Sequence, residues 1–134
     1  MPKKLVIAGT LLIVLITAII IMWQNYELSS DYNYFTAKLD IKNGRVQVVN
    51  VGSPVDSSKD KEIEMAAAKY GFKNIYIKLD TTIHKMKGIN NYNEVVEAYL
   101  VLRNGNNWRA TYQKEVDSLY RAASNKNNSS NEQH

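Results

Sequence analysis

The sequence predicts an α+β protein: a transmembrane helix followed by a small β-β-α-β-α-α domain with a three-stranded sheet and a C-terminal helical hairpin. Three observations predict this fold class. Residues 5–23 form an unbroken apolar run, residues 35–51 alternate around an Asn-Gly pair, and the apolar residues between 91 and 123 recur with the period of a helix. The chain therefore divides into a cytoplasmic N-terminus (1–4), a transmembrane helix (5–23), a juxtamembrane linker (24–33), an extracytoplasmic domain (34–123) and a tail (124–134).

The apolar run at 5–23 carries no charged side chain. At 1.5 Å per residue it is roughly 28 Å long, which matches the ~30 Å hydrocarbon core of a bilayer. Trp23 and Tyr26 lie at its end, and aromatic rings of this kind are enriched at the headgroup level. We therefore expect a single-pass helix that anchors the chain in a bilayer, with Trp23 and Tyr26 at the membrane interface.

The charges on either side of the run predict its orientation. Lys3 and Lys4 precede it, whereas Glu27 and Asp31 follow it. Because basic flanks stay in the cytoplasm, we expect the domain on the outer side of the plasma (inner) membrane. Secretion after signal cleavage is the alternative, but residues 22–25 offer no small-x-small cleavage pattern. The chain has no cysteine, which excludes lipid attachment at a cysteine.

The first element of the domain is predicted to be a β-hairpin. Four apolar residues alternate with polar ones over residues 35–42, which is the period of a strand with one buried face. Asn43 and Gly44 follow, and both residue types tolerate the positive φ of a two-residue hairpin turn. The return strand is Arg45–Val51.

A helix and a third strand come next. The helix is expected from Lys59 to Tyr70, with Ser57 or Ser58 as its cap and Gly71 as a left-handed terminator. The strand covers residues 72–79, and a strand-helix-strand succession predicts that it runs parallel to residues 45–51. The acidic residues of the helix, Asp60, Glu62 and Glu64, favour the positive end of its dipole, so no metal site and no cofactor is predicted there.

The C-terminal part is predicted to be a helical hairpin after a loop at residues 80–90. Asn91 and Glu94 form a variant of the capping box for a first helix, and Asn104-Gly105 ends it. Trp108 begins a second amphipathic helix. The alternative is a β-hairpin over residues 95–112, which is disfavoured because apolar residues would then occupy both faces. The tail from Ser124 is polar, and we expect it to be disordered.

These motifs resemble a group of short uncharacterised bacterial single-span membrane proteins. The shared features are the Asn-Gly pair at 43–44, a Tyr-Gly-aromatic step at 70–72, a Tyr-Asn pair at 92–93 and a Gly-x-x-Trp-Arg helix start at 105–109. Relatives in that group often carry a cysteine shortly after the Tyr-Gly step, and this chain has none. Since the group has no assigned activity, the resemblance implies an architecture and no function.

Three functions compete on the sequence alone. The first is a non-enzymatic interaction domain of the cell envelope, whose partners are the lipid bilayer and an envelope protein or polymer. The second is a small membrane-bound immunity or accessory protein that binds a toxin. The third, the least favoured, is a small hydrolase that uses His84, with Asp80 and Thr81 or Thr82 as its companions. The formal net charge of +4 is small and scattered, so no nucleic-acid partner is expected.

Overall fold

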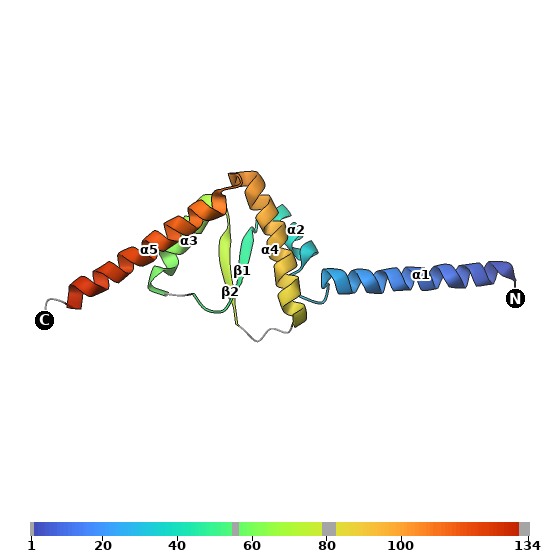
Figure 1. The fold of residues 1–134 in the computed structure, drawn as a ribbon. Helices are drawn as coiled ribbons and strands as arrows, with labels where there is room; N and C mark the ends of the chain where they lie inside the picture. The colour runs from blue at the N-terminus through green and yellow to red at the C-terminus, as the bar shows by residue number, and fades with distance from the viewer. Residues whose placement is uncertain (1, 55–56, 79–82, 132–134) are drawn as a thin grey trace.

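A computed structural model describes residues 2–54, 57–78 and 83–131 of the chain. These residues form α-helices, one short 3-10 helix (η1) and a two-stranded sheet (Figure 1). In chain order the elements are α1 (Lys3–Tyr26), α2 (Tyr34–Lys42), β1 (Gln47–Val51), η1 (Ser57–Lys59), α3 (Asp60–Tyr70), β2 (Lys73–Ile77), α4 (Ile83–Asn104) and α5 (Trp108–Asn131).

The two strands lie at the centre of the domain. They run parallel, with Val49 opposite Ile75, and α3 makes the crossover between them, so the predicted parallel pairing is confirmed. In Figure 1, α3 and α5 lie on one side of the strands, and α4 and α2 lie on the other. The core between these layers includes Tyr92, Val96 and Leu100 of α4, whose side chains are fully buried.

The predicted three-stranded sheet is wrong, because the first predicted strand is the helix α2. Its four apolar residues alternate, but they also form two pairs at i,i+4. Ala37 and Ile41 pack toward the core, whereas Phe35 and Leu39 are exposed on the opposite side. The alternation that predicts a strand is therefore also the pattern of a short helix with two apolar sides.

A capping box selects the helix over the strand. The side chain of Asn33 accepts hydrogen bonds from the backbone N–H groups of Phe35 and Thr36 at 2.9 and 3.1 Å. In return, the Thr36 hydroxyl accepts one from the Asn33 N–H at 2.9 Å. The cap therefore gives the N–H groups of Phe35 and Thr36 a partner within the chain. In a strand at this position, the Asn33 side chain would not accept both of these hydrogen bonds.

The pair Asn43-Gly44 ends α2 and is not a hairpin turn. Gly44 is in the left-handed region with φ 75°. Its N–H donates to the carbonyl of Ile41, and the N–H of Arg45 donates to the carbonyl of Asp40, which is the Schellman pattern of a helix end. A helix terminus and an Asn-Gly turn require the same positive φ, so the dipeptide alone does not distinguish them.

Residues 83–91 are helical. The predicted loop over 80–90 is wrong from Ile83 onward, because these residues form the first turns of α4. Asn91 therefore lies inside the helix and does not cap it. Gly88 is buried in this first part of α4, and glycine in a helix interior is unfavourable, which explains the prediction of a loop.

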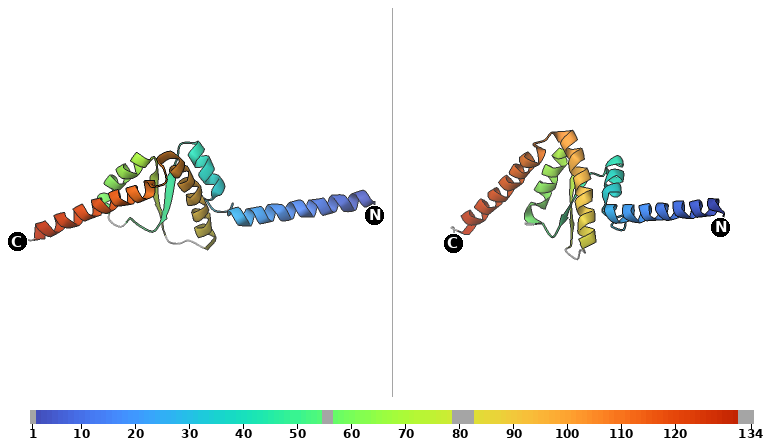
Figure 2. Two further views of the ribbon diagram at one scale, coloured as in Figure 1. Left: turned by 45° about the horizontal axis from the view of Figure 1, so that its top comes forward. Right: turned by 45° about the vertical axis from the view of Figure 1, so that its right-hand side comes forward.

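The predicted helical hairpin is present as two consecutive helices, but they diverge (Figure 2). Gly105, with φ 87°, follows α4, and its N–H donates to the carbonyl of Val101 at 2.8 Å. From there α5 packs along α3, where Lys69 forms an ion pair with Glu115. The helix then continues past Ser124 to Asn131, where the sequence predicts a disordered tail.

Aromatic rings hold α3, β2 and α5 together. Trp108 is 2 % exposed, and its ring lies 5.5 Å from the ring of Phe72 between centroids. Tyr112 contacts the rings of Phe72 and Tyr70 at 5.1 and 5.6 Å. The end of α4 joins the same cluster, because Asn104 donates a hydrogen bond to the carbonyl of Tyr70 at 2.9 Å.

Candidate functional site at the end of the apolar helix

Helix α1 has an apolar surface that the described part of the chain does not cover. Its 24 residues include no buried side chain, and the mean hydropathy of its most apolar stretch is 3.0. It is the one described helix that is long and apolar enough to cross a membrane. Where it ends, the ring of Tyr26 contacts the rings of Tyr34 and Phe35 at 5.6 and 5.4 Å. The anchor candidate is thus joined to α2 by aromatic contacts.

Glu27 makes a polar connection between the end of α1 and the start of α4. It is the one described residue other than glycine with a positive φ, 48°, and its side chain is only 7 % exposed. Its carboxylate lies 3.5 Å from His84 Nδ1 and 3.7 Å from Lys87 Nζ. A buried carboxylate is costly unless it is paired, so this connection depends on the two basic side chains of α4.

Gly88 allows the segment after Glu27 to lie directly on α4. A Cβ atom at this position would lie 2.5 Å from the carbonyl oxygen of Tyr32 and 2.7 Å from Ser30 Oγ. The Tyr32 carbonyl and α4 could make room for a Cβ atom only by separating, which would open the contact between residues 30–32 and α4. Residues 27–33 and the first turns of α4, hereafter the junction, therefore form one closely packed unit.

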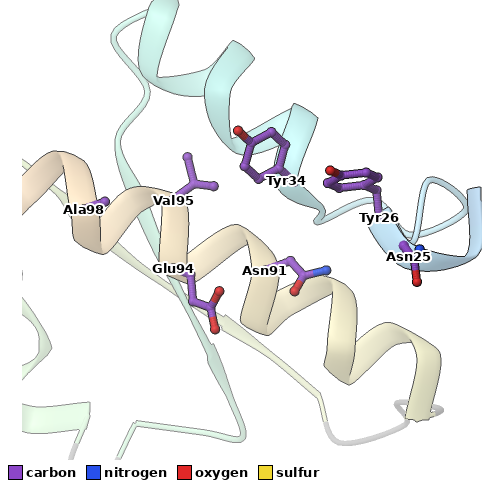
Figure 3. A pocket seen from close by; sticks show the side chains of 7 residues that line it. All are labelled: Asn25, Tyr26, Tyr34, Asn91, Glu94, Val95 and Ala98. Atoms are coloured by element: carbon purple, nitrogen blue, oxygen red, sulfur yellow. The ribbon is translucent and has the colours of Figure 1, made fainter. Parts of the chain in front are cut away.

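Two hollows flank the junction. One, of about 380 Å³, lies between the end of α1, α2 and α4 (Figure 3). Tyr26 and Tyr34 line one wall, and Glu94 and Val95 of α4 line the opposite wall. The other hollow, of about 590 Å³, is lined by Glu27, Ser29, His84 and Lys87, together with Gln24 and Asn25 at the end of α1. Amide and carboxylate side chains line both hollows, and aromatic rings line the first.

The structure places His84 in the first turn of α4, with its side chain 81 % exposed. Its described partner is Glu27, and Ser29 lines the same hollow. No hydrogen bond between Ser29 and His84 is among the contacts of the described residues. Asp80, Thr81 and Thr82, the companions considered from the sequence, lie outside the described residues. The described site thus contains a histidine–carboxylate contact without a hydroxyl nucleophile bonded to it.

Within residues 2–54, 57–78 and 83–131, no group of three or more His, Cys, Asp or Glu side chains could hold a metal ion. The pKa of Glu62, in the acidic start of α3, is lowered by hydrogen bonds to its carboxylate from the backbone and from Lys59. This carboxylate serves its own helix end.

The Tyr-Asn pair at 92–93, whose contacts the sequence did not predict, fixes α4 against the rest of the domain. The amide of Asn93 accepts from the backbone N–H of Val49 and donates to its carbonyl, at 2.9 and 2.8 Å, which covers the outer edge of β1. The hydroxyl of Tyr92 donates to Asp40 Oδ2 at 2.8 Å and ties α4 to α2. Burial of the phenol raises the pKa of Tyr92, and this hydrogen bond raises it further by a smaller amount. No local pattern marks either contact, because the partners are 44 and 52 residues away.

The interface residues expected from the sequence, Trp23 and Tyr26, lie in the last turn of α1 and are 54 % and 39 % exposed. Gly71 and Gly105 lie at the ends of α3 and α4 with positive φ. A local signal for α2 is present in the sequence as the capping pair Asn33-x-x-Thr36. Asn33 immediately precedes the helix, and Thr36 lies in its first turn. No protein family, curated protein or solved structure matches this chain. The resemblance noted from its short motifs therefore stays a prediction.

Proposed function

We propose that the chain is a single-span protein of the inner membrane whose folded domain, held on the extracytoplasmic side, is a non-enzymatic interaction module of the cell envelope. The observation that carries the proposal is the uncovered apolar surface of α1. Exposed side chains such as Leu11, Ile13 and Leu15 are 58–66 % accessible along a helix that lacks any buried residue. Lipid covers such a surface, whereas water around it would favour aggregation.

The junction supports an anchor that is retained and not removed. A signal peptide needs no contacts with the mature domain, because it is cleaved away. Here the last residue of α1, Tyr26, contacts Tyr34 and Phe35, and the next residue, Glu27, is buried against α4. Cleavage after residues 22–25 would leave these rings and the Glu27 turn without the helix that positions them.

The other end of the molecule supports an interaction role. The termini lie at opposite ends, and α5 leads away from the side on which α1 leaves the domain (Figures 1 and 2). Beyond Leu119 and Tyr120, which pack against the core, Arg121 and Ala122 are exposed. A helical arm of this kind offers side chains to a partner at a distance from the bilayer, and the domain would position that arm.

Two measurements on the full chain test the proposal. First, the intact mass of protein extracted from membranes after an alkaline wash should include residues 1–26; a protein released by the wash, or one that begins after residue 22, would contradict the anchor. Second, a photo-crosslinking amino acid at Ala122 should give an adduct of defined mass with another envelope component in cells. The matched control is the same amino acid at Leu12, which should crosslink lipid. Recovery of the uncrosslinked monomer alone at Ala122 would count against the interaction role.

A further inference from the structure

We propose that the outer side of α2 lies in the lipid headgroup layer and makes a second membrane contact that prefers anionic lipids. This inference rests on the proposed anchor, α1. It concerns a surface that is already fully formed in the domain, and it goes beyond the anchor because it fixes how the domain is oriented on the bilayer.

The outer side of α2 consists of its exposed residues. Phe35, Lys38, Leu39 and Lys42 are the exposed residues of this helix, and their spacing of i, i+3, i+4 and i+7 places them on one side. Phe35 is 44 % and Leu39 is 55 % exposed, which is high for large apolar side chains in a small domain. On this side two apolar side chains alternate with two lysines, whose stems can cover apolar surface while their charges reach the lipid headgroups.

The contacts of Tyr26 set the level of this surface relative to the bilayer. Tyr26 ends the apolar helix, so a spanning α1 places its ring at the headgroup level. The ring of Phe35 lies 5.4 Å from that ring between centroids, which places the start of α2 at the same level. Figures 1 and 2 show that α2 runs across the direction of α1 and does not extend it. Helix α2 therefore runs along the bilayer surface, with Leu39 one turn further on.

The charges on α2 suit anionic headgroups. Lys38 and Lys42 lie on the outer side, and neither has an ion-pair partner among the described residues. Lys38 Nζ lies 4.5 Å from the centre of the Tyr34 ring, so its ammonium group makes a cation–π contact while the side chain remains exposed. The acid of this helix, Asp40, is on the other side, where it binds Arg45 and Tyr92. On the outer side of α2, an anionic surface would meet two lysines and no acidic side chain.

The test uses the absence of cysteine from the chain, which makes single-cysteine labelling specific. An environment-sensitive fluorophore is attached at Leu39→Cys in the full chain, reconstituted into vesicles of phosphatidylcholine with phosphatidylglycerol. The control is Leu102→Cys, an 88 % exposed leucine near the end of α4. We expect a blue-shifted emission and quenching by headgroup-level spin-labelled lipid at position 39, and neither at position 102. Equal, water-like emission at both positions would overturn the proposal.

Charge variants test the lipid preference. In the presence of phosphatidylglycerol, Lys38→Gln/Lys42→Gln should lower the ratio of lipid-contacting to water-exposed probe roughly thirtyfold. Lys61→Gln/Lys114→Gln removes the same charge from exposed positions of α3 and α5 and should leave the ratio unchanged. An equal loss in both double variants would contradict a specific α2 contact.

A third probe separates this inference from the proposed anchor. A fluorophore at Leu12→Cys in α1 should be shielded from water in every vesicle. If Leu12 is shielded but Leu39 is not, the anchor stands and the α2 contact is refuted. If Leu12 is exposed to water, both are refuted. If Leu39 is shielded only at high protein-to-lipid ratio and spin-labelled lipid does not quench it, a second copy of the chain covers α2, and the lipid contact is refuted.

Discussion

Two halves of the domain are held together by different kinds of contact. The junction half consists of residues 27–42 and the first turns of α4, and the distal half consists of α3, β2 and the start of α5. The distal half is held by the rings of Tyr70, Phe72, Trp108 and Tyr112, which contact one another at 5.1–6.3 Å between centroids. The junction half also has ring contacts, such as Tyr32 with Tyr92 at 5.3 Å, but it depends in addition on individual polar contacts and on the close approach at Gly88. The distal half should therefore respond to lost volume, and the junction to changes of geometry and hydrogen bonding.

The largest effect is expected in the distal half. Trp108→Ala should lower the free energy of unfolding by about 3–5 kcal/mol, because it removes a 2 % exposed side chain from the centre of the aromatic cluster. Urea unfolding of the full chain in detergent, followed by circular dichroism, measures this. Trp108→Phe is the control. It should cost clearly less, because it keeps a ring and removes an indole N–H that has no hydrogen-bond partner among the described residues. Equal losses in the two variants would contradict the role given to ring packing.

Gly88→Ala tests the junction through the sign of its effect. Helix propensity alone would stabilise α4 by about 1 kcal/mol. A Cβ atom 2.5 Å from the Tyr32 carbonyl should reverse that sign and cost up to about 3 kcal/mol. Gly9→Ala is the matched control, since a Cβ atom there meets nothing within 4 Å. The measurement is the same urea titration, with proteolysis of residues 27–33 as a local readout. A more stable Gly88→Ala variant would show that the junction is not closely packed.

Asn93 links the two halves through the edge of β1. Asn93→Leu should destabilise the domain by about 1–3 kcal/mol, because the N–H and carbonyl of Val49, a residue that is 3 % exposed, lose their partner. Asn93→Asp keeps an acceptor for the N–H but sets a carboxylate against the carbonyl. Amide hydrogen exchange at Val49 should accelerate strongly in the leucine variant and less in the aspartate variant. Unchanged exchange at Val49 in both would refute this contact.

The smallest effect concerns pH. Burial raises the pKa of Tyr92, so the folded state holds this proton more tightly than the unfolded state. The resulting stabilisation is complete below the ordinary tyrosine pKa of about 10 and is lost as pH rises through the raised value. Tyr92→Phe should therefore cost about 1 kcal/mol at neutral pH and show a flatter loss of stability above pH ~10. Parallel curves for the two proteins would contradict the assignment.

The same comparison explains which parts of the fold could be predicted from the sequence. In the distal half the signals are local: Gly71 follows α3 directly, and Ile75 lies in a short run rich in β-branched and aromatic residues, as does its partner Val49 in the adjoining strand β1. The parallel pairing then follows from the general handedness of crossover connections. Trp108 and Tyr112 are at i,i+4, so their shared side of α5 could also be predicted.

In the junction half the deciding contacts are not local. Phe35 is exposed on α2 and contacts the end of α1, whereas Ala37 faces the core. The sequence does not distinguish these two environments. Gly88 indicates a loop unless the Tyr32 carbonyl above it is known. Glu27, a plain acidic residue after the apolar run, gives no sign that it is buried against His84 and Lys87. These positions depend on tertiary contacts, which override propensity.

We propose that α1 is a retained anchor and that the domain lies outside the membrane that it spans. Single cysteines at Lys3 and Ser124, on opposite sides of α1, test it directly with a membrane-impermeant maleimide in cells whose outer membrane, where there is one, has been opened. We expect Ser124→Cys to react before lysis and Lys3→Cys to react only after it. Reaction of Lys3→Cys before lysis, with Ser124→Cys protected, would contradict the orientation, and recovery of Ser124→Cys from the medium without residues 1–22 would contradict the anchor.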